Sequence, residues 1–159
     1  MNYELNTPST IQICSLEAVH LADTSIYEGI ITIEDGGIKN PFRIKDDYTK
    51  QLVMCFDDIS FPYDEYILPQ KKHIIRALEF ADKIGDGSLL IHCNAGVSRS
   101  SSIALAILAK KHGEGFENNA MKELVKINPY CRPNKLMTEL TDEFLHRDGK
   151  LIEVVSKIY

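Results

Sequence analysis

The chain has 159 residues, of which 44% are hydrophobic and 26% are charged, and its net charge is −5. This length suits one domain over residues 1–159, and the composition is that of a globular chain rather than a disordered one. The negative charge argues against nucleic acid or an acidic membrane as a partner, because both recruit a basic surface. No stretch is as long as a membrane span of about eighteen apolar residues, and residues 1–10 lack a secretion signal. We therefore expect a cytoplasmic protein.

The four cysteines are spread along the chain and form no CxxC pair; they are Cys14, Cys55, Cys93 and Cys131. This spacing suits neither a zinc site nor a small disulfide-bonded scaffold. The histidines are also scattered and show no metal-ligand spacing. We therefore expect reduced thiols, no metal and no cofactor.

Hydrophobic runs and their flanking turn residues predict the elements in chain order. Strands are expected at residues 10–15, 29–33, 51–56 and 88–92, and the first is expected to be buried. Helices are expected at residues 16–24, 69–84, 99–112, 116–127, 135–146 and 150–158. The first helix would direct Leu16, Val19 and Ala22 to one side. Pro69 is expected in the first turn of the second helix, where its missing N–H does no harm.

Strands that alternate with helices are typical of an α/β fold. We expect a central, mainly parallel sheet of four to five strands flanked by helices, with an entirely helical C-terminal part. The segment 38–50 shows no periodicity and is expected to be a loop. Residues 99–112 are apolar almost all round from Ile103 to Ala109, which predicts a central helix.

The stretch "HCNAGVSRS" lies where the fourth strand is expected to become this central helix. Small residues separate Cys93 from Arg99, so the backbone can curl with its N–H groups converging, as in anion sites at helix N-termini. The planar guanidinium of Arg99 can hold two phosphate oxygens at once. The same amides and the cation favour ionisation of Cys93. The pattern therefore predicts a phosphate cradle that contains a cysteine nucleophile.

This stretch resembles the signature of the cysteine-dependent protein tyrosine phosphatase superfamily, and its alanine and serine most resemble the dual-specificity branch. Weaker similarity runs from about residue 55 to residue 145, and the chain is also similar to small prokaryotic tyrosine-phosphatase-like proteins. The resemblance implies that Cys93 attacks phosphorus and forms a phosphocysteine. The implied substrate-binding residues are Asn94, Ala95, Gly96, Val97, Ser98 and Arg99, which would hold the phosphoryl oxygens.

Other roles are also implied by the resemblance. His92 would support the loop, and Ser100 would assist release of phosphate from the sulfur. Asn134, which follows Pro133, would brace the phosphate loop, although a helix N-cap is an equally good interpretation of this residue. Arg132 could be a second basic residue at the rim or a solvated charge.

The mechanism needs an acid to protonate the leaving oxygen, and the resemblance implies an Asp after the preceding strand. Asp58 is preferred because "DISFP" is similar to an Asp-x-x-x-Pro arrangement in dual-specificity relatives, with Asp57 and Asp64 as alternatives. Asp58 lies 35 residues before Cys93, slightly more than in the family, because residues 63–70 look inserted. This insertion is interpreted as a surface loop, with a lid that carries Tyr63 or Tyr66 as the alternative.

The side chains of the predicted phosphate loop between Cys93 and Arg99 are neutral, which favours a phosphorylated protein or peptide over a phosphoinositide. Little chain precedes the second strand, so we expect a shallow pocket that accepts phosphotyrosine, phosphoserine and phosphothreonine. Phosphate, sulfate, vanadate or tungstate should also bind there. The alternatives are a phosphopeptide-binding module with weak turnover, or the same chemistry on a phosphoinositide, a nucleotide or an RNA phosphate.

Overall fold

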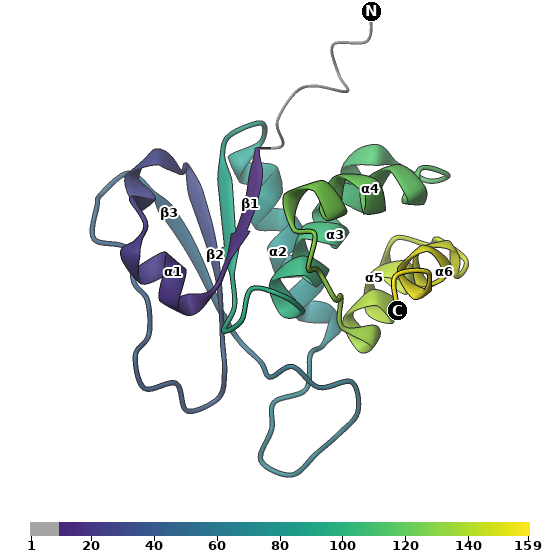
Figure 1. Ribbon diagram of the computed structural model, residues 1–159, viewed down its shortest axis with the longest axis horizontal. Helices are drawn as coiled ribbons and strands as arrows, with labels where there is room; N and C mark the ends of the chain where they lie inside the picture. Colours follow the sequence, from purple (N-terminus) through teal and green to yellow (C-terminus); the bar gives the residue numbers. More distant parts are fainter. Residues whose placement is uncertain (1–9) are drawn as a thin grey trace, which may run out of the picture.

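The computed structural model describes residues 10–159 (Figure 1), so the expectation of no secretion signal in residues 1–10 falls almost wholly outside the described residues. The strands are β1 (Ile11–Cys14), β2 (Gly29–Glu34), β3 (Lys50–Cys55) and β4 (Leu89–His92). The helices are α1 (Leu16–Leu21), the 3-10 turn η2 (Thr24–Ile26), α2 (Lys71–Ile84), α3 (Arg99–His112), α4 (Glu117–Ile127), α5 (Lys135–Phe144) and α6 (Lys150–Ser156).

The four described strands form one sheet in the order β1-β4-β2-β3, and every neighbouring pair is parallel. The sequence prediction of an α/β fold with a parallel sheet and a helical C-terminal part is therefore confirmed. Because all strands run the same way, their carboxyl ends meet at one edge, which lies at the bottom of Figure 1. In open sheets of this kind, ligands bind outside the carboxyl ends of the strands.

The two faces of the sheet are covered unequally. The helices α2 to α6 lie on one side and α1 lies on the other (Figure 1). The larger core joins the sheet to α3, which also packs against α2, α4 and α5, so α3 is the central helix that its composition predicts. The smaller core, under α1, contains Val19, Ile30, Phe42 and Leu90. Phe42 belongs to the segment between β2 and β3, which forms a loop as expected.

The structure differs from the sequence expectations in the limits or the burial of several helices and strands. The helix α1 stops at Leu21, and only Val19 of the expected stripe is buried, because Ala22 already has extended backbone. The strand β1 is only partly buried, since it lies at the edge of the sheet. The helix α2 begins at Lys71 with Gln70 as its N-cap, so Pro69 precedes the helix instead of entering its first turn.

The last helices are shorter than expected: α5 ends at Phe144 and α6 ends at Ser156. Arg147, which follows α5, bonds to the carbonyl groups of Gly113 and Ala109 and to the buried carboxylate of Glu117. This arginine ties the end of α3 to the start of α4. The helix α5 stops before His146, whose φ of +56° does not fit a right-handed helix. No helix within residues 10–159 is long and apolar enough to cross a membrane.

Candidate active site

The junction between β4 and α3 forms a loop whose carbonyl groups face outward. Donors outside the loop hold three of these groups: Leu16 N–H bonds to the carbonyl of Asn94 at 3.0 Å, Asn128 Nδ2 to that of Gly96 at 2.9 Å, and Arg132 N–H to that of Val97 at 2.9 Å. In a trans peptide, the carbonyl of one residue and the N–H of the next point in opposite directions. The amides of Ala95, Val97 and Ser98 therefore point to the inside of the loop, as an anion cradle requires.

Gly96 makes this curvature possible. Its φ is +73°, in the left-handed region that side chains disfavour. A Cβ atom at this position would also lie 2.7 Å from the backbone carbonyl carbon of Cys14, at the end of β1. The loop therefore needs glycine for two independent reasons, its conformation and its close contact with the neighbouring strand.

Cys93 lies at the base of the cradle and is 2% exposed. Its Sγ accepts a hydrogen bond from Gly96 N–H at 3.3 Å and lies 3.2 Å from the buried hydroxyl of Ser100. The sulfur is therefore in contact with one backbone amide and one hydroxyl group. Burial and the negative charge of Cys93 raise the pKa of the neighbouring thiol of Cys14 to about 11. Cys14 is therefore a neutral neighbour rather than a second nucleophile.

Arg99 is the first residue of α3 and is only 5% exposed. Its Nη1 donates to the carbonyl of Phe56 at 2.9 Å and lies 2.5 Å from a carboxylate oxygen of Asp35. Among the described residues, its buried Nε has no hydrogen-bond partner. A buried N–H of a guanidinium without a partner is costly, and Arg99 is one of the residues that line the cavity above Cys93.

Asp35 was missed as a site residue, because in the sequence it reads only as part of the turn after β2. It lines the cavity and ion-pairs with Arg99 because β2 lies next to β4 in the sheet. The signal that could have found it is a carboxylate at the carboxyl end of a buried strand. That signal is usable only when the strand order is known.

His92 is buried below the cradle in the neutral form. Its Nδ1 lies 3.3 Å from the carbonyl of Cys93, and its Nε2 lies 2.9 Å from the hydroxyl of Thr32. A carbonyl can only accept, so Nδ1 carries the proton and Nε2 accepts from Thr32. Desolvation lowers the pKa of His92 to about 4. This arrangement agrees with the supporting role that the resemblance implies.

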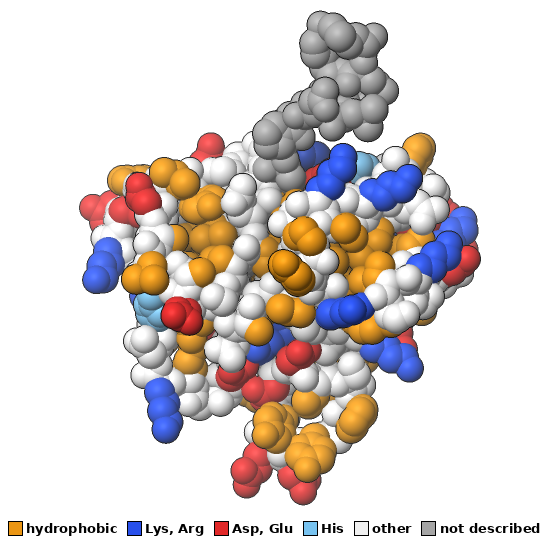
Figure 2. Space-filling model, in the orientation of Figure 1, with side chains coloured by type: hydrophobic (Ala, Val, Ile, Leu, Met, Phe, Trp, Pro, Cys, Tyr) orange, Lys and Arg blue, Asp and Glu red, His pale blue; other side chains and the backbone are white. Residues whose placement is uncertain are grey.

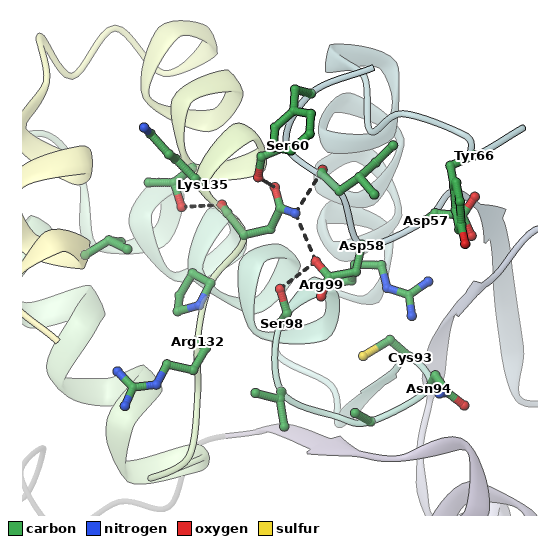
Figure 3. Close-up of a pocket in the computed structure, with 18 of the residues that line it drawn as sticks. Asp57, Asp58, Ser60, Tyr66, Cys93, Asn94, Ser98, Arg99, Arg132 and Lys135 are labelled. Carbon is green, nitrogen blue, oxygen red and sulfur yellow. Dashed lines mark hydrogen bonds between the residues drawn. The ribbon is translucent and has the colours of Figure 1, made fainter. Parts of the chain in front are cut away.

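The three candidate acids occupy different surroundings. Asp58 lines the cavity, and its Oδ1 accepts hydrogen bonds from the hydroxyl of Ser98 at 2.8 Å and from Asn134 Nδ2 at 2.9 Å (Figure 3). Asp57 is buried, and its two oxygens accept from the amides of Gly36 and Ile67. Asp64 does not line the cavity. Asp57 also lines the cavity, but its oxygens accept from backbone amides, whereas Asp58 contacts side chains of the loop after β4 and of the N-cap of α5.

Asn134 performs both of the tasks that the sequence left open. Its Oδ1 accepts from Met137 N–H and so caps α5. Its backbone N–H donates to Ser102 Oγ, which in turn donates to the carbonyl of Ser98 in the phosphate loop. Its Nδ2 also holds Asp58, a contact that the sequence did not predict. Asn134 thus links the phosphate loop to the segment that carries the acid.

The cavity above Cys93 has a volume of about 1330 Å³. The expected residues that line it are Cys93, Asn94, Ala95, Val97, Ser98, Arg99, Asp58 and Asn134, together with Asp57 and Arg132. Ser100, His92 and Gly96 support it from behind. Further lining residues that were not foreseen include Phe61, Lys135, Ile152 and Val155. Within residues 10–159, no group of His, Cys, Asp and Glu is arranged to hold a metal ion.

The side chain of Arg132 is partly engaged by residues at the C-terminal end of the chain. Its guanidinium donates to the carbonyl of Ile158 and lies 5.4 Å from the centroid of the Tyr159 ring. Figure 3 shows Arg132 and Lys135 on one side of the cavity and Asp57 and Tyr66 on the other. Arg132 is therefore a rim residue, as one of the two sequence interpretations held.

No family model matches the chain. Among curated proteins, the dual specificity protein phosphatase YVH1 of Plasmodium falciparum is 40% identical over 75 residues, which cover 46% of this chain and 12% of that protein. The tyrosine-protein phosphatase YVH1 of Saccharomyces cerevisiae is 26% identical over 117 residues, which cover 73% of this chain and 32% of that protein. The matched regions thus span about a tenth to a third of the length of these relatives.

Among solved structures, the crystal structure of DUSP15 has a TM-score of 0.65 with this chain at 22% identity, and the match covers 94% of this chain and 92% of that one. The fold of this protein is therefore that of the dual-specificity phosphatases. Its sequence relatives carry the same designation, and the cradle, the cysteine and the arginine lie where the signature implies. In sequence and in fold, the chain is therefore similar to the cysteine-dependent protein tyrosine phosphatases, and in particular to proteins named as dual-specificity phosphatases.

Proposed function

We propose that residues 1–159 form one phosphatase unit that hydrolyses phosphate monoesters of protein side chains through a phosphocysteine. One observation carries this proposal: Cys93, the loop with its inward amides and Arg99 all line a cavity that Asp58 also lines. A binding module would need the amides and the arginine. It would need neither a cysteine sulfur in contact with an amide and a hydroxyl group nor a carboxyl group in the same cavity.

In the first step, the thiolate of Cys93 attacks phosphorus and the bond from phosphorus to the substrate oxygen breaks. Asp58 donates its proton to that oxygen, so the product leaves as a neutral alcohol or phenol. The amides of the loop and the guanidinium of Arg99 stabilise the negative charge on the other three phosphoryl oxygens. Such preorganised donors supply most of the catalysis in phosphoryl transfer.

In the second step, water attacks phosphorus and the bond from phosphorus to sulfur breaks. The carboxylate of Asp58 accepts the proton of the water, which restores the acid for the next cycle. The hydroxyl of Ser100, 3.2 Å from the sulfur, donates to the departing thiolate. Inorganic phosphate then leaves, and its analogues sulfate, vanadate and tungstate should occupy the same cradle.

The substrate class follows from the loop side chains. The four variable positions between Cys93 and Arg99 carry no charge, so they provide no counterions for the extra phosphates of a phosphoinositide; they are Asn94, Ala95, Val97 and Ser98. The curated relatives are named as protein phosphatases, which agrees with a phosphorylated protein as the substrate.

The decisive experiment replaces the nucleophile. Cys93→Ser should abolish hydrolysis of para-nitrophenyl phosphate while tungstate still binds, as measured by calorimetry, because the amides and Arg99 remain. Cys55→Ser, which changes an exposed cysteine, is the matched control and should retain turnover. Hydrolysis that persists in Cys93→Ser would remove Cys93 as the nucleophile, and loss of tungstate binding would contradict the cradle.

A further inference from the structure

Three polar side chains form a row across the sheet, on the face that carries the smaller core. Thr32 in β2 lies between Gln51 in β3 and His92 in β4, because β2 is flanked by these two strands. In the parallel register, Thr32 is paired with His92, and Gln51 is paired with Ile30, two residues before Thr32. Side chains two residues apart share a face of a sheet. We call Gln51, Thr32 and His92 the polar row.

The polar row lies in apolar surroundings beneath α1, on the left of Figure 1. Thr32 and His92 are buried, and the ring of Phe42 packs edge-on against that of His92, with centroids 5.7 Å apart. Figure 2 shows hydrophobic side chains and charges of both signs interspersed over this side of the molecule. Buried polar groups are costly unless their hydrogen bonds are made, so the direction of each bond in the row can be worked out.

The first bond is fixed by the amide group of Gln51. Its Oε1 accepts from Ile44 N–H at 3.0 Å, and its Nε2 donates to the carbonyl of Phe42 at 3.1 Å and to the hydroxyl of Thr32 at 2.8 Å. The opposite amide orientation would set two donors against each other at Ile44 and two acceptors at Phe42. The oxygen of Thr32 therefore accepts a hydrogen bond from Gln51.

The second bond follows from the first. The hydroxyl of Thr32 has one proton, and it lies 2.9 Å from Nε2 of His92. If Nε2 accepts this proton, the neutral ring carries its own proton on Nδ1, which lies 3.3 Å from the carbonyl of Cys93. The other tautomer would leave the Thr32 proton without an acceptor and set the lone pair of Nδ1 against this carbonyl. Both ends of the row therefore require the same tautomer.

The last bond of the row acts on the first peptide group of the phosphate loop. Because the carbonyl of Cys93 is held by His92, the N–H of Asn94 in the same trans peptide points the opposite way, toward the cradle. We infer that Gln51 and Thr32 are positioning residues of the phosphatase, which hold His92 in the Nδ1-protonated tautomer and thereby orient the peptide group after the nucleophile. This inference rests on the proposed function, since only turnover gives that peptide group a catalytic task.

Gln51 also acts on His92 by a second route. The carbonyl that it holds belongs to Phe42, whose ring packs against the imidazole, and the N–H that it accepts belongs to Ile44. Both residues lie in the loop between β2 and β3. In the sequence, Gln51 is only the first residue of a predicted strand, so local patterns give no sign of this role. Its task depends on the order of three strands in the sheet.

The test measures the tautomer of His92 and the turnover of para-nitrophenyl phosphate in the same variants. Long-range ¹⁵N–¹H NMR spectra distinguish the two ring nitrogens, and a His92→Asn spectrum assigns the signals. The wild-type protein should carry the proton on Nδ1. Thr32→Val keeps the shape of the side chain but removes the hydroxyl, so neither tautomer satisfies both nitrogens. The single tautomer should be lost, and kcat should fall by about tenfold, the usual effect of one hydrogen bond.

Two further variants test the direction of the bonds. Thr32→Ser keeps the hydroxyl and should restore the Nδ1 tautomer and most of the turnover. Gln51→Glu has the same shape but cannot donate, so the hydroxyl of Thr32 should turn to the carboxylate and Nε2 should gain a proton. Thr141→Val is the matched control, because this hydroxyl is equally buried but donates to the carbonyl of Met137 in α5. It should change neither the tautomer nor the turnover.

The outcomes separate this inference from the proposed function. If the wild-type protein does not hydrolyse para-nitrophenyl phosphate, the proposed function fails. If it does, and Thr32→Val keeps either the wild-type tautomer or the wild-type kcat, the positioning role is refuted while the phosphatase stands. An equal loss of kcat in Thr32→Ser and Thr32→Val would assign the effect to packing and also refute it. Thermal unfolding confirms that each variant folds; if Thr32→Val does not, Gln51→Leu at a half-buried position replaces it and should likewise lose the single tautomer.

Discussion

At the scale of single residues, the site depends on two groups that reach one cavity from different segments. The sulfur of Cys93 lies at the base of the cradle, and the carboxyl group of Asp58 lies above it, held by Ser98 and Asn134. Ser98 belongs to the loop after Cys93, so its hydroxyl couples the position of Asp58, the proposed acid, to that of Cys93, the proposed nucleophile. The oxygens of Asp57 accept from the amides of Gly36 and Ile67 instead, and this difference supports the proposal of Asp58 as the acid.

Asp58→Asn should slow hydrolysis of phenyl phosphate by about 10²- to 10⁴-fold, the usual contribution of general acid catalysis. It should slow hydrolysis of para-nitrophenyl phosphate much less, because nitrophenolate leaves without a proton. The measurement is kcat/KM for a series of aryl phosphates whose leaving groups differ in basicity. Asp64→Asn, outside the cavity, is the control and should match the wild-type protein. An equal loss for every leaving group would exclude Asp58 as the acid.

At the scale of elements, the junction of β4 and α3 is stabilised by its neighbours as well as by its own hydrogen bonds. The edge strand β1 packs against Gly96, and donors from α1 and from the segment after α4 hold the carbonyl groups of the loop. The cradle is therefore a product of several elements that meet at one edge of the sheet. The shape of the cradle should therefore depend on how closely these elements can approach one another.

Gly96→Ala tests this close approach. The positive φ alone should cost about 1 to 2 kcal/mol in the free energy of unfolding, and the contact of the new Cβ with the backbone of Cys14 should add to that cost. Turnover should be lost as well, because the amides can no longer converge. Urea unfolding and an aryl phosphatase assay provide the two measurements.

Gly37→Ala is the matched control for this variant. Gly37 has a φ of +76°, but nothing lies within 4 Å of its would-be Cβ. Gly37→Ala should therefore lower the free energy of unfolding only by the cost of the backbone conformation, without a clash. This variant should also retain phosphatase turnover. Equal behaviour of the two variants would mean that the contact between Gly96 and β1 has no role in shaping the cradle.

At the scale of the whole molecule, two buried neutral histidines make stability depend on pH. Burial lowers the pKa of His92 to about 4, and burial together with Lys72 and Arg76 lowers the pKa of His73 to about 4. The ring of His73 lies 4.4 Å from that of Phe56, whose carbonyl holds Arg99. Protonation of His73 would therefore disturb a contact that joins α2 to the strand end beside the site.

The sign of the pH effect follows from proton linkage. Between the ordinary histidine pKa of about 6.5 and the lowered value, the unfolded chain binds protons that the folded chain does not bind. The free energy of unfolding should therefore fall as the pH drops through this window, by up to about 1.4 kcal/mol per pH unit for each histidine.

Urea unfolding of His73→Gln over the same pH range checks this expectation. The variant should lose less stability than the wild-type protein between pH 6.5 and pH 4, because one of the two groups is gone. Above that window the two curves should run parallel, since both histidines are neutral there, which provides an internal control. Parallel curves throughout would show that His73 does not contribute to the pH dependence.

The sequence by itself determined the features that depend on neighbouring residues. The limits of α3, the turn at Gly96 and the order from Cys93 to Arg99 follow from local periodicity and steric rules, and the structure places each as expected. The α/β class followed in the same way, since alternating strands and helices leave few alternatives. Local rules failed at some element ends: Gln70 caps α2, so Pro69 lies outside that helix, and α5 ends before His146, whose φ is +56°.

Only the tertiary structure decided which distant residues share the cavity. The ion pair of Asp35 with Arg99 requires β2 to lie next to β4, and the sequence does not give that order. The position of the segment 57–67 depends on the hydrogen bonds of Asp57 with Gly36 and Ile67 and on that of Asn134 with Ile59. The sequence already preferred Asp58 as the acid, but its contacts with Ser98 and Asn134 are visible only in the structure. These outcomes rest on contacts between segments far apart in the chain, and local patterns carry no information about such contacts.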